Sequence, residues 1–330
     1  MKLSALAAAL IIALILGFSP MAWGQPAEKA RRVGILFTLP RSDPINARLR
    51  DALVGGLRDR GWEEGKNIVL EERFAGGDAV RFRELAAELV ALSVDVILTA
   101  QTQAIVAARA KTTTIPIIMV SIADPVGSGL VASLARPGGN ITGMANQNET
   151  IPAKNLELLK ENKPGIKRVG IFFSPDNSPA ARTLKAMQEE VAPRLGLTVL
   201  PLAVTKPEDF SEAFSTIIRE RAEALLVFTT PVVTAHRTKI AEFAIQHHLP
   251  SMALADFLVR DGLLMSYGYD ILGNWRRAAS FVDRIFKGAK PSDLPVEQVD
   301  QFRLVINLKT ARAIDFDVTS LLSRADEVIE

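Results

Sequence analysis

The chain has 330 residues, of which 48% are hydrophobic and 23% are charged. This length is sufficient for two domains with separate cores, and the composition excludes intrinsic disorder. Lys and Arg number 39 against 37 Asp and Glu, so the chain has no basic excess to neutralise a phosphate backbone, and we expect no nucleic-acid partner. The sequence contains no cysteine, which excludes disulfides, thiol catalysis, Cys-ligated metals and a lipid-modified N-terminal cysteine.

The first 24 residues have the pattern of a secretory signal peptide. Lys2 supplies a positive region, residues 3–18 are apolar, and the small residues Ala22 and Gly24 stand three and one positions before the expected cleavage site. An uncleaved membrane anchor is the competing interpretation, because the apolar run approaches the ~18 residues of a spanning helix. Pro20 and the small residues favour cleavage after Gly24. We therefore expect a soluble mature chain in a bacterial periplasm, without a lipid anchor.

From residue 31 onward the sequence alternates short apolar runs with amphipathic segments. Apolar runs without polar alternation are typical of strands covered on both faces, as in a parallel sheet. The strands predicted in this first half cover residues 32–38, 68–74, 94–99 and 115–120. The helices predicted between them cover residues 45–60, residues 79–92 and an alanine-rich segment capped by residues 101–103. Pro125 follows the fourth strand and stands where a further helix is expected to begin.

The pattern repeats in the second half of the chain. Residues 168–174 (RVGIFFS) match residues 32–38 (RVGILFT) in a basic residue, a Val-Gly-Ile run, an apolar pair and a terminal hydroxyl. Further strands are predicted at residues 197–204, 224–230, 251–256, 263–269 and 302–307. The helices predicted here cover residues 179–195 and 270–286, and the tail from Leu308 is also expected to be helical.

These two halves predict an α/β fold of two doubly wound parallel-sheet lobes with a cleft between them, because strands alternating with helices form βαβ units. One lobe is expected to hold residues 31–146 plus 270–300, and the other residues 147–269 plus 301–330. The hinge is expected at the crossings near Asn146 and Tyr269. Small ligands bind such folds at the carboxyl ends of the strands.

Polar residues follow the predicted strands at this edge of both sheets. The ligand-binding candidates are Thr38, Asp43, Gln101, Thr102, Ser121 and Asp124 in the first lobe, and Ser174, Asn177, Thr229, Thr230, Asp256 and Tyr267 in the second. Most are hydroxyls and amides, which suit a small polar or zwitterionic molecule. Helix N-termini after Thr102 and Asp124 would hold a carboxylate, and Asp124 or Asp256 an ammonium group. Asp124, Ser174 and Asn177 are equally good helix caps without a ligand, so both interpretations stay open.

The sequence contains no recognisable catalytic constellation. His247 and His248 are adjacent at the end of a predicted helix, a spacing that does not suit a metal site. No Gly-x-Ser-x-Gly elbow is present, and Thr38 rather than a glycine-rich phosphate loop follows the first strand. We therefore expect neither enzymatic activity nor a metal or other cofactor.

Three motifs of the chain resemble one known family. They are residues 122–131 (IADPVGSGLV), residues 136–143 (RPGGNITG) and residues 304–311 (LVINLKTA), and the turn at residues 61–67 (GWEEGKN) is also similar. The chain resembles the periplasmic substrate-binding proteins of ABC transporters with the type 1 fold, in the branch that includes tryptophan and tyrosine binders. The resemblance covers residues 32–330 and implies a monomer.

The resemblance implies that a ligand sits between the lobes and that the closed form docks on a membrane permease driven by a separate ATPase. The matching contact positions are Gln101, Thr102, Ser121, Asp124, Ser174, Asn177, Thr229, Thr230 and Asp256. An amino acid or a related carboxylate is the expected ligand. The alternative role is a ligand sensor whose closed form contacts a signalling receptor.

The chain departs from the amino-acid binders at two strand ends. Where those proteins carry a polar run after the strand that ends at Phe228, this chain has residues 229–233 (TTPVV), and residues 253–257 (ALADF) are more apolar than expected. An aromatic amino acid, a more apolar carboxylate and an unrelated metabolite therefore remain open as ligands.

Overall fold

The structure is a computed structural model that describes residues 30–146, 150–176 and 178–330. The predicted signal peptide, residues 1–24, lies outside these ranges. Within them, no helix is long and apolar enough to cross a membrane.

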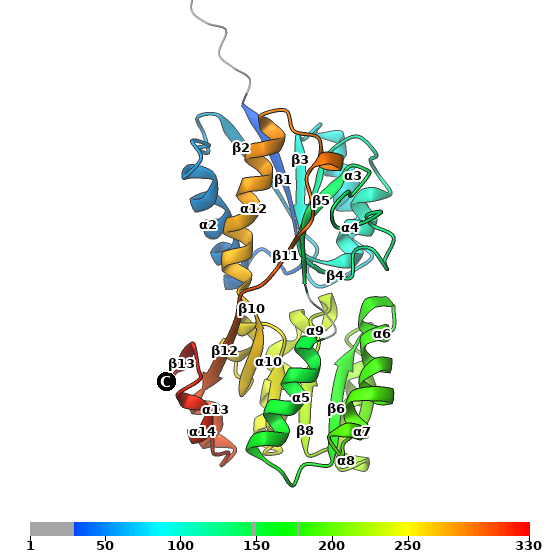
Figure 1. The fold of residues 1–330 in the computed structure, drawn as a ribbon, viewed down its shortest axis with the longest axis vertical. Helices are drawn as coiled ribbons and strands as arrows, with labels where there is room; N and C mark the ends of the chain where they lie inside the picture. The colour runs from blue at the N-terminus through cyan, green and yellow to red at the C-terminus, as the bar shows by residue number, and fades with distance from the viewer. Residues whose placement is uncertain (1–29, 147–149, 177) are drawn as a thin grey trace, which may run out of the picture. The chain divides into compact units, whose positions relative to one another are not determined.

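The first lobe is built on a six-stranded sheet in the order β11-β5-β4-β3-β1-β2, in which every pair of neighbours is parallel. Its strands are β1 (Arg31–Phe37), β2 (Ile68–Phe74), β3 (Val96–Thr99), β4 (Ile117–Ala123), β5 (Ile141–Asn146) and β11 (Glu297–Gln298). Its helices are α2 (Pro44–Arg58), α3 (Phe82–Ala91), α4 (Thr102–Arg109) and α12 (Ile271–Phe286). Figure 1 shows α2 and α12 on one side of this sheet and α3 and α4 on the other.

Both faces of the sheet are buried because apolar side chains alternate between two cores. Ile35 packs with Trp275 of α12 in one core, and Leu36 packs with Phe82 of α3 in the other. Helices α2 and α12 approach closely at Gly56, where a β-carbon would lie 2.3 Å from the Arg276 carbonyl oxygen. The glycine therefore allows the two helices to share one face of the sheet.

The second lobe is built on a seven-stranded sheet in the order β13-β12-β10-β9-β8-β6-β7. Its strands are β6 (Arg168–Phe173), β7 (Thr198–Ala203), β8 (Ala224–Val227), β9 (Ser251–Ala253), β10 (Met265–Tyr269), β12 (Phe302–Asn307) and β13 (Glu327–Ile329). Its longer helices are α5 (Thr150–Asn162), α6 (Ser178–Ala186), α8 (Asp209–Arg219) and α10 (Arg237–Gln246). The shorter ones are α7 (Ala192–Arg194), α9 (Pro231–Ala235), α11 (Asp256–Arg260), α13 (Leu308–Ala313) and α14 (Thr319–Leu322), and a π-helical turn (Met187–Val191) joins α6 to α7.

The predicted fold of two α/β lobes is confirmed, with two corrections in the second lobe. Strand β12 runs antiparallel to β10, because the chain returns to this sheet from the first lobe instead of through a crossover helix. The tail from Leu308 is not entirely helical, since α14 is followed by β13, which pairs with β12 at the edge of the sheet. The chain passes between the sheets after β5, after β10 and again between β11 and β12, so three segments cross.

A third correction concerns the segment after β4. The helix expected at Pro125 is absent, and residues 125–129 form turns. Asp124 has a left-handed backbone (φ 40°), and its Oδ1 accepts a hydrogen bond of 2.7 Å from the Gly127 amide. The carboxylate thus closes a turn and does not cap a helix.

Candidate functional site

A cavity of about 120 Å³ lies where strand ends of the two lobes meet. Its polar lining consists mainly of hydroxyls and amides. The first lobe contributes Thr38, Asn46, Gln101, Thr102, Ser121 and Asn146, and the second lobe contributes Thr183, Thr229, Thr234 and Tyr269. Its apolar lining includes Phe37 and Trp275 on one side and Phe228, Leu254 and Phe257 on the other. A mostly apolar chamber with a few convergent polar groups is typical of a small-molecule site.

The structure brings five of the predicted site residues to this cavity. They are Thr38, Gln101, Thr102, Ser121 and Thr229. Thr38 follows β1 directly, Gln101, Thr102 and Thr229 come two or three residues after β3 and β8, and Ser121 lies near the end of β4. The carboxyl ends of parallel strands meet at one edge of a sheet. Ligand contact by these five residues stays a prediction.

Six other predicted residues lie outside the cavity lining. Asp43 caps α2 and pairs with Arg237, Thr230 caps α9, and Ser174 is buried beyond β6. Asp124 and Tyr267 line a second groove, which adjoins the cavity at Asn146 and Thr183. Asp256 is buried at the start of α11. Asn177 lies outside the described residues.

Several lining residues could not be predicted from the sequence, because they come from helices or from the segments that cross between the lobes. Asn46 lies in the first turns of α2, Thr234 in α9, and Trp275 in α12, more than 200 residues from β1. The Tyr269 hydroxyl, at the end of β10, lies beside the Thr229 and Asn146 side chains, and burial raises the pKa of this phenol. No local signal marks these positions, because the tertiary packing of two lobes brings them together.

In the part of the chain that the structure describes, four polar atoms of the cavity lining find no hydrogen-bond partner. They are Ser121 Oγ, Asn146 Oδ1, Thr234 Oγ1 and Trp275 Nε1, on side chains that are 5%, 7%, 3% and 1% exposed. A buried polar group without a partner costs free energy, and such groups gather where a ligand supplies the missing partner. These atoms therefore define the polar side of the candidate site.

The backbone at Ser121 is strained. Its φ is +59°, and the register of β4 against β5 shifts between Met119 and Ile122, which is a β-bulge. The Asn146 Nδ2 donates to the Ser121 carbonyl oxygen at 2.9 Å and holds the bulge from the neighbouring strand. Bulges and left-handed residues re-aim side chains at functional sites, so this geometry supports Ser121 as a ligand contact.

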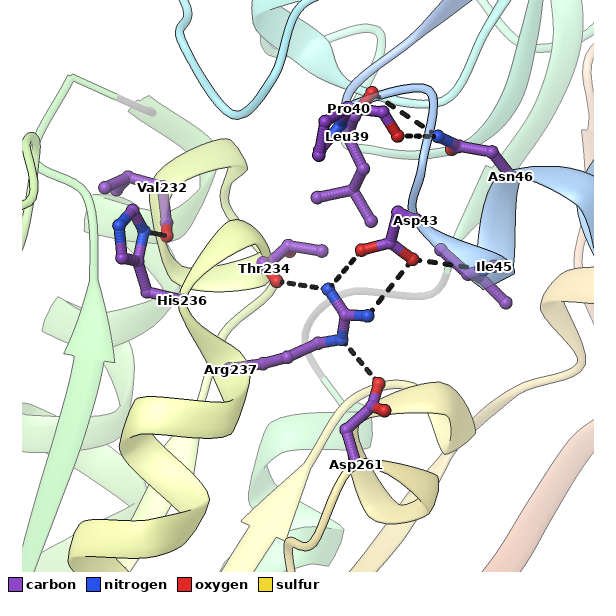
Figure 2. Close-up of polar contacts among 10 residues, drawn as sticks. All are labelled: Leu39, Pro40, Asp43, Ile45, Asn46, Val232, Thr234, His236, Arg237 and Asp261. Carbon is purple, nitrogen blue, oxygen red and sulfur yellow. Dashed lines mark hydrogen bonds and ion pairs between the residues drawn. The ribbon is translucent and has the colours of Figure 1, made fainter.

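A buried arginine connects the two lobes beside the cavity. In Figure 2, the Arg237 guanidinium of α10 reaches Asp43 at the start of α2, with N–O distances of 2.8 and 3.1 Å. Its Nε donates to Asp261 of the same lobe at 2.5 Å, and another nitrogen donates to the Thr234 carbonyl oxygen at 2.9 Å. Arg237 is 6% exposed, so the pair with Asp43 is a desolvated contact between lobes. We call Asp43, Arg237 and Asp261 the interlobe clamp.

Two further contacts join the lobes. Gly77, after β2, packs so tightly on α9 that a β-carbon would lie 2.5 Å from the Ala235 β-carbon. Asp124 pairs with Arg182 of α6 across the second groove. With the interlobe clamp, these contacts describe a closed arrangement of the lobes.

Burial raises the pKa of the Asp256 carboxyl, although Arg260, Arg303 and Arg48 oppose the shift. A raised pKa means that the folded state holds the proton more tightly than the unfolded state does. Stability therefore falls as the pH rises between the unfolded and folded pKa values. Above that window the charged carboxylate is a net cost, and its Oδ1 has no partner.

We expect Asp256→Asn to raise the melting temperature by a few degrees at pH 7, because the amide avoids the buried charge. The gain should shrink as the pH falls toward about 4, the unfolded pKa of aspartate. Thermal unfolding of both chains between pH 4 and pH 8 checks this. A gain that is the same at every pH would contradict the titration argument, and so would a loss at pH 7.

Comparison with known proteins identifies relatives along nearly the whole chain. A tyrosine-binding protein of Clostridioides difficile (strain R20291) is 25% identical over 294 residues, which is 89% of this chain and 84% of that protein. An ABC domain from Streptococcus pneumonia, solved in complex with L-Trp, is 25% identical with a TM-score of 0.82 and covers 91% of this chain and 100% of its own.

A conserved domain protein from Vibrio cholerae O1 biovar El Tor gives a similar result, with 26% identity, a TM-score of 0.83 and the same coverage of both chains. The profile of the family described as ABC transporter substrate binding protein matches residues 37–329. That span includes both sheets apart from most of β1. The chain therefore belongs to the ABC transporter substrate-binding protein family.

Proposed function

We propose that this protein is the solute-binding component of an ABC importer, which captures a small ligand between its lobes and presents the closed form to a membrane permease. The observation that carries this proposal is the interlobe cavity with four unpartnered polar atoms. The interlobe clamp supports a closing motion, because its central contact forms only when the lobes meet. Ligand binding would then shift an open–closed equilibrium.

The ligand class follows from what the relatives bind. L-Trp in the pneumococcal complex and tyrosine in the clostridial relative's name share a carboxylate and an aromatic ring. We extend this shared chemistry to the present chain, whose cavity combines aromatic walls with hydrogen-bond donors. Thr38, Gln101, Thr102, Ser121 and Thr229 are the proposed polar contacts.

The working form in this proposal is a monomer released into the periplasm after cleavage of residues 1–24. It binds its ligand without turnover and carries no cofactor. The proposal places the lobe boundaries near residues 146, 270 and 300, because the chain passes from one sheet to the other near these residues. Membership of a transporter family favours delivery to a permease over the sensory alternative.

A thermal-shift screen of residues 25–330 against amino acids, aromatic acids, nucleosides and sugars tests the proposal. A ligand at 100 times its Kd should add about 2.7 kcal/mol to the free energy of unfolding. The same ligand should decrease the radius of gyration measured by small-angle X-ray scattering. A ligand that stabilises the chain at an unchanged radius would contradict capture by closure.

We expect Ser121→Ala to weaken binding of that ligand about 10-fold, because a hydrogen bond to a charged group contributes roughly 1.5 kcal/mol or more. The melting temperature without ligand should stay the same or rise slightly, since Ser121 Oγ has no partner to lose and alanine keeps the same backbone strain. Titration calorimetry and thermal unfolding separate the two effects. Unchanged affinity would remove Ser121 from the site.

A further inference from the structure

We propose that the ligand is an aromatic carboxylic acid without an amino group. This inference rests on the proposed function and narrows its ligand class. Among the residues that the structure describes, none that lines the cavity is Asp, Glu, Lys, Arg or His. An ammonium group in a largely apolar chamber needs a carboxylate beside it, because an unpaired buried charge is strongly unfavourable. Within the described lining, the cavity therefore offers an ammonium group no counter-charge.

Asp43 and Asp124, two carboxylates near the cavity, are paired with arginines, while a third, Asp256, keeps its Oδ1 without a partner but lies outside the cavity lining. Asp43 receives two hydrogen-bonded contacts from Arg237, and Asp124 pairs with Arg182. Asp256 stands nearest to the Arg260 guanidinium, at 3.8 Å, and does not line the cavity. Asp124 and Asp256, the two residues expected from the sequence to hold an ammonium group, therefore lie next to arginines.

An acidic group has a better place in the same cavity. Helix α4 begins at Thr102, and the Gln101 side chain does not cap it, so the first amide groups of this helix have no side-chain acceptor. Thr99, the last residue of β3, pairs with Met119 of β4; Gln101 and Ser121 each come two residues later, and both line the cavity. Ser121 is 5% exposed and its hydroxyl has no partner. A helix N-terminus and a buried donor together suit a carboxylate.

The apolar part of the cavity suits a flat ring. Phe37 and Trp275 stack with their ring centroids 5.4 Å apart and their planes 6° apart, and both line the cavity. Phe228 and Phe257 line it from the second lobe. Aromatic rings pack well in offset-stacked and edge-to-face geometries, which these walls provide.

Titration calorimetry on residues 25–330 with two matched pairs of compounds tests the proposal. The pairs are indole-3-propanoate with L-tryptophan, and 3-phenylpropanoate with L-phenylalanine, in which only the amino group differs. We expect at least one acid to bind 10-fold or more tightly than its amino acid. Because these titrations use the whole mature chain, residues 147–149 and 177 are present in the protein that is measured. An amino acid that binds as tightly as its acid, or more tightly, would overturn the proposal.

A variant that supplies the missing charge gives an independent check. Thr229 lines the cavity, is partly buried and comes two residues after the end of β8. Thr229→Asp should change the ratio of the amino acid's affinity to the acid's affinity at least 10-fold in favour of the amino acid. Thr229→Asn introduces a side chain of the same shape as aspartate without its charge, and it should leave this ratio unchanged. Equal shifts in both variants would contradict the charge argument. If none of the four compounds binds while the wider screen yields another ligand, the acid proposal fails and the capture function stands.

Discussion

Replacing Asp43 by asparagine will weaken ligand binding about 30-fold. The Asp43 and Arg237 side chains are 10% and 7% exposed, and they form a buried ion pair between lobes. Removing one partner of such a pair costs roughly 2 kcal/mol or more, and 2 kcal/mol corresponds to about 30-fold in affinity. The cost falls on closure, because Arg237 regains water when the lobes separate. Calorimetry with the ligand that the screen selects, together with the radius of gyration of the free chain, measures both effects.

The asparagine variant isolates the charge from the helix cap. Asp43 Oδ1 accepts a hydrogen bond from the Ile45 amide at 3.0 Å, and asparagine caps helices as well as aspartate does. Asp261→Asn is the matched control, since it removes the same charge from the same guanidinium within one lobe. Its affinity should stay within about fivefold of the parent chain, because a pair with an exposed partner contributes at most ~1 kcal/mol and Asp261 is one-third exposed. Equal losses in both variants would show that the interlobe clamp does not govern closure.

The fold was predictable because strands and helices carry local signals. Buried strands such as β1 and β6 are continuous apolar runs bounded by polar residues, and the repeat between them reveals two similar lobes. The prediction from local signals was wrong where a side chain makes a different hydrogen bond from the one expected. Pro125 can begin a helix, but the Asp124 carboxylate accepts from the Gly127 amide and closes a turn. Strand β13 has only three residues, so its sequence carries too little pattern to reveal it.

Half of the candidate site was predictable for the same reason. Thr38 and Gln101 follow their strands in the sequence, and a parallel sheet brings such residues to one edge. Asp43 also follows a strand, but its carboxylate is held by an arginine 194 residues away. Trp275 reaches the cavity because α12 returns to the first lobe from the second. Contacts of such long sequence separation depend on packing between elements, which no single segment encodes.

Replacing Gly143 by alanine will destabilise the fold by about 3–5 kcal/mol. Gly143 lies in β5 with φ +132°, a conformation that costs other residues roughly 1–3 kcal/mol. A β-carbon there would lie 2.2 Å from the Met119 carbonyl oxygen and 2.6 Å from its amide nitrogen. Relieving this overlap with rigid backbone costs roughly another 1–3 kcal/mol. Urea unfolding gives the loss directly, and the melting temperature should fall by about 10 °C.

Gly139→Ala is the matched control, because its β-carbon would meet no atom within 4 Å and its φ is not positive. It should leave the free energy of unfolding unchanged or raise it by roughly 0.4–1 kcal/mol, because alanine lowers the conformational entropy of the unfolded chain. Gly143 pairs with Met119 where the register of β4 shifts, so the missing side chain also makes room for the bulge that carries Ser121. We therefore expect any folded fraction of the Gly143 variant to bind ligand more weakly. A variant that melts like the parent chain would show that β5 and β4 do not approach as closely as the structure has them.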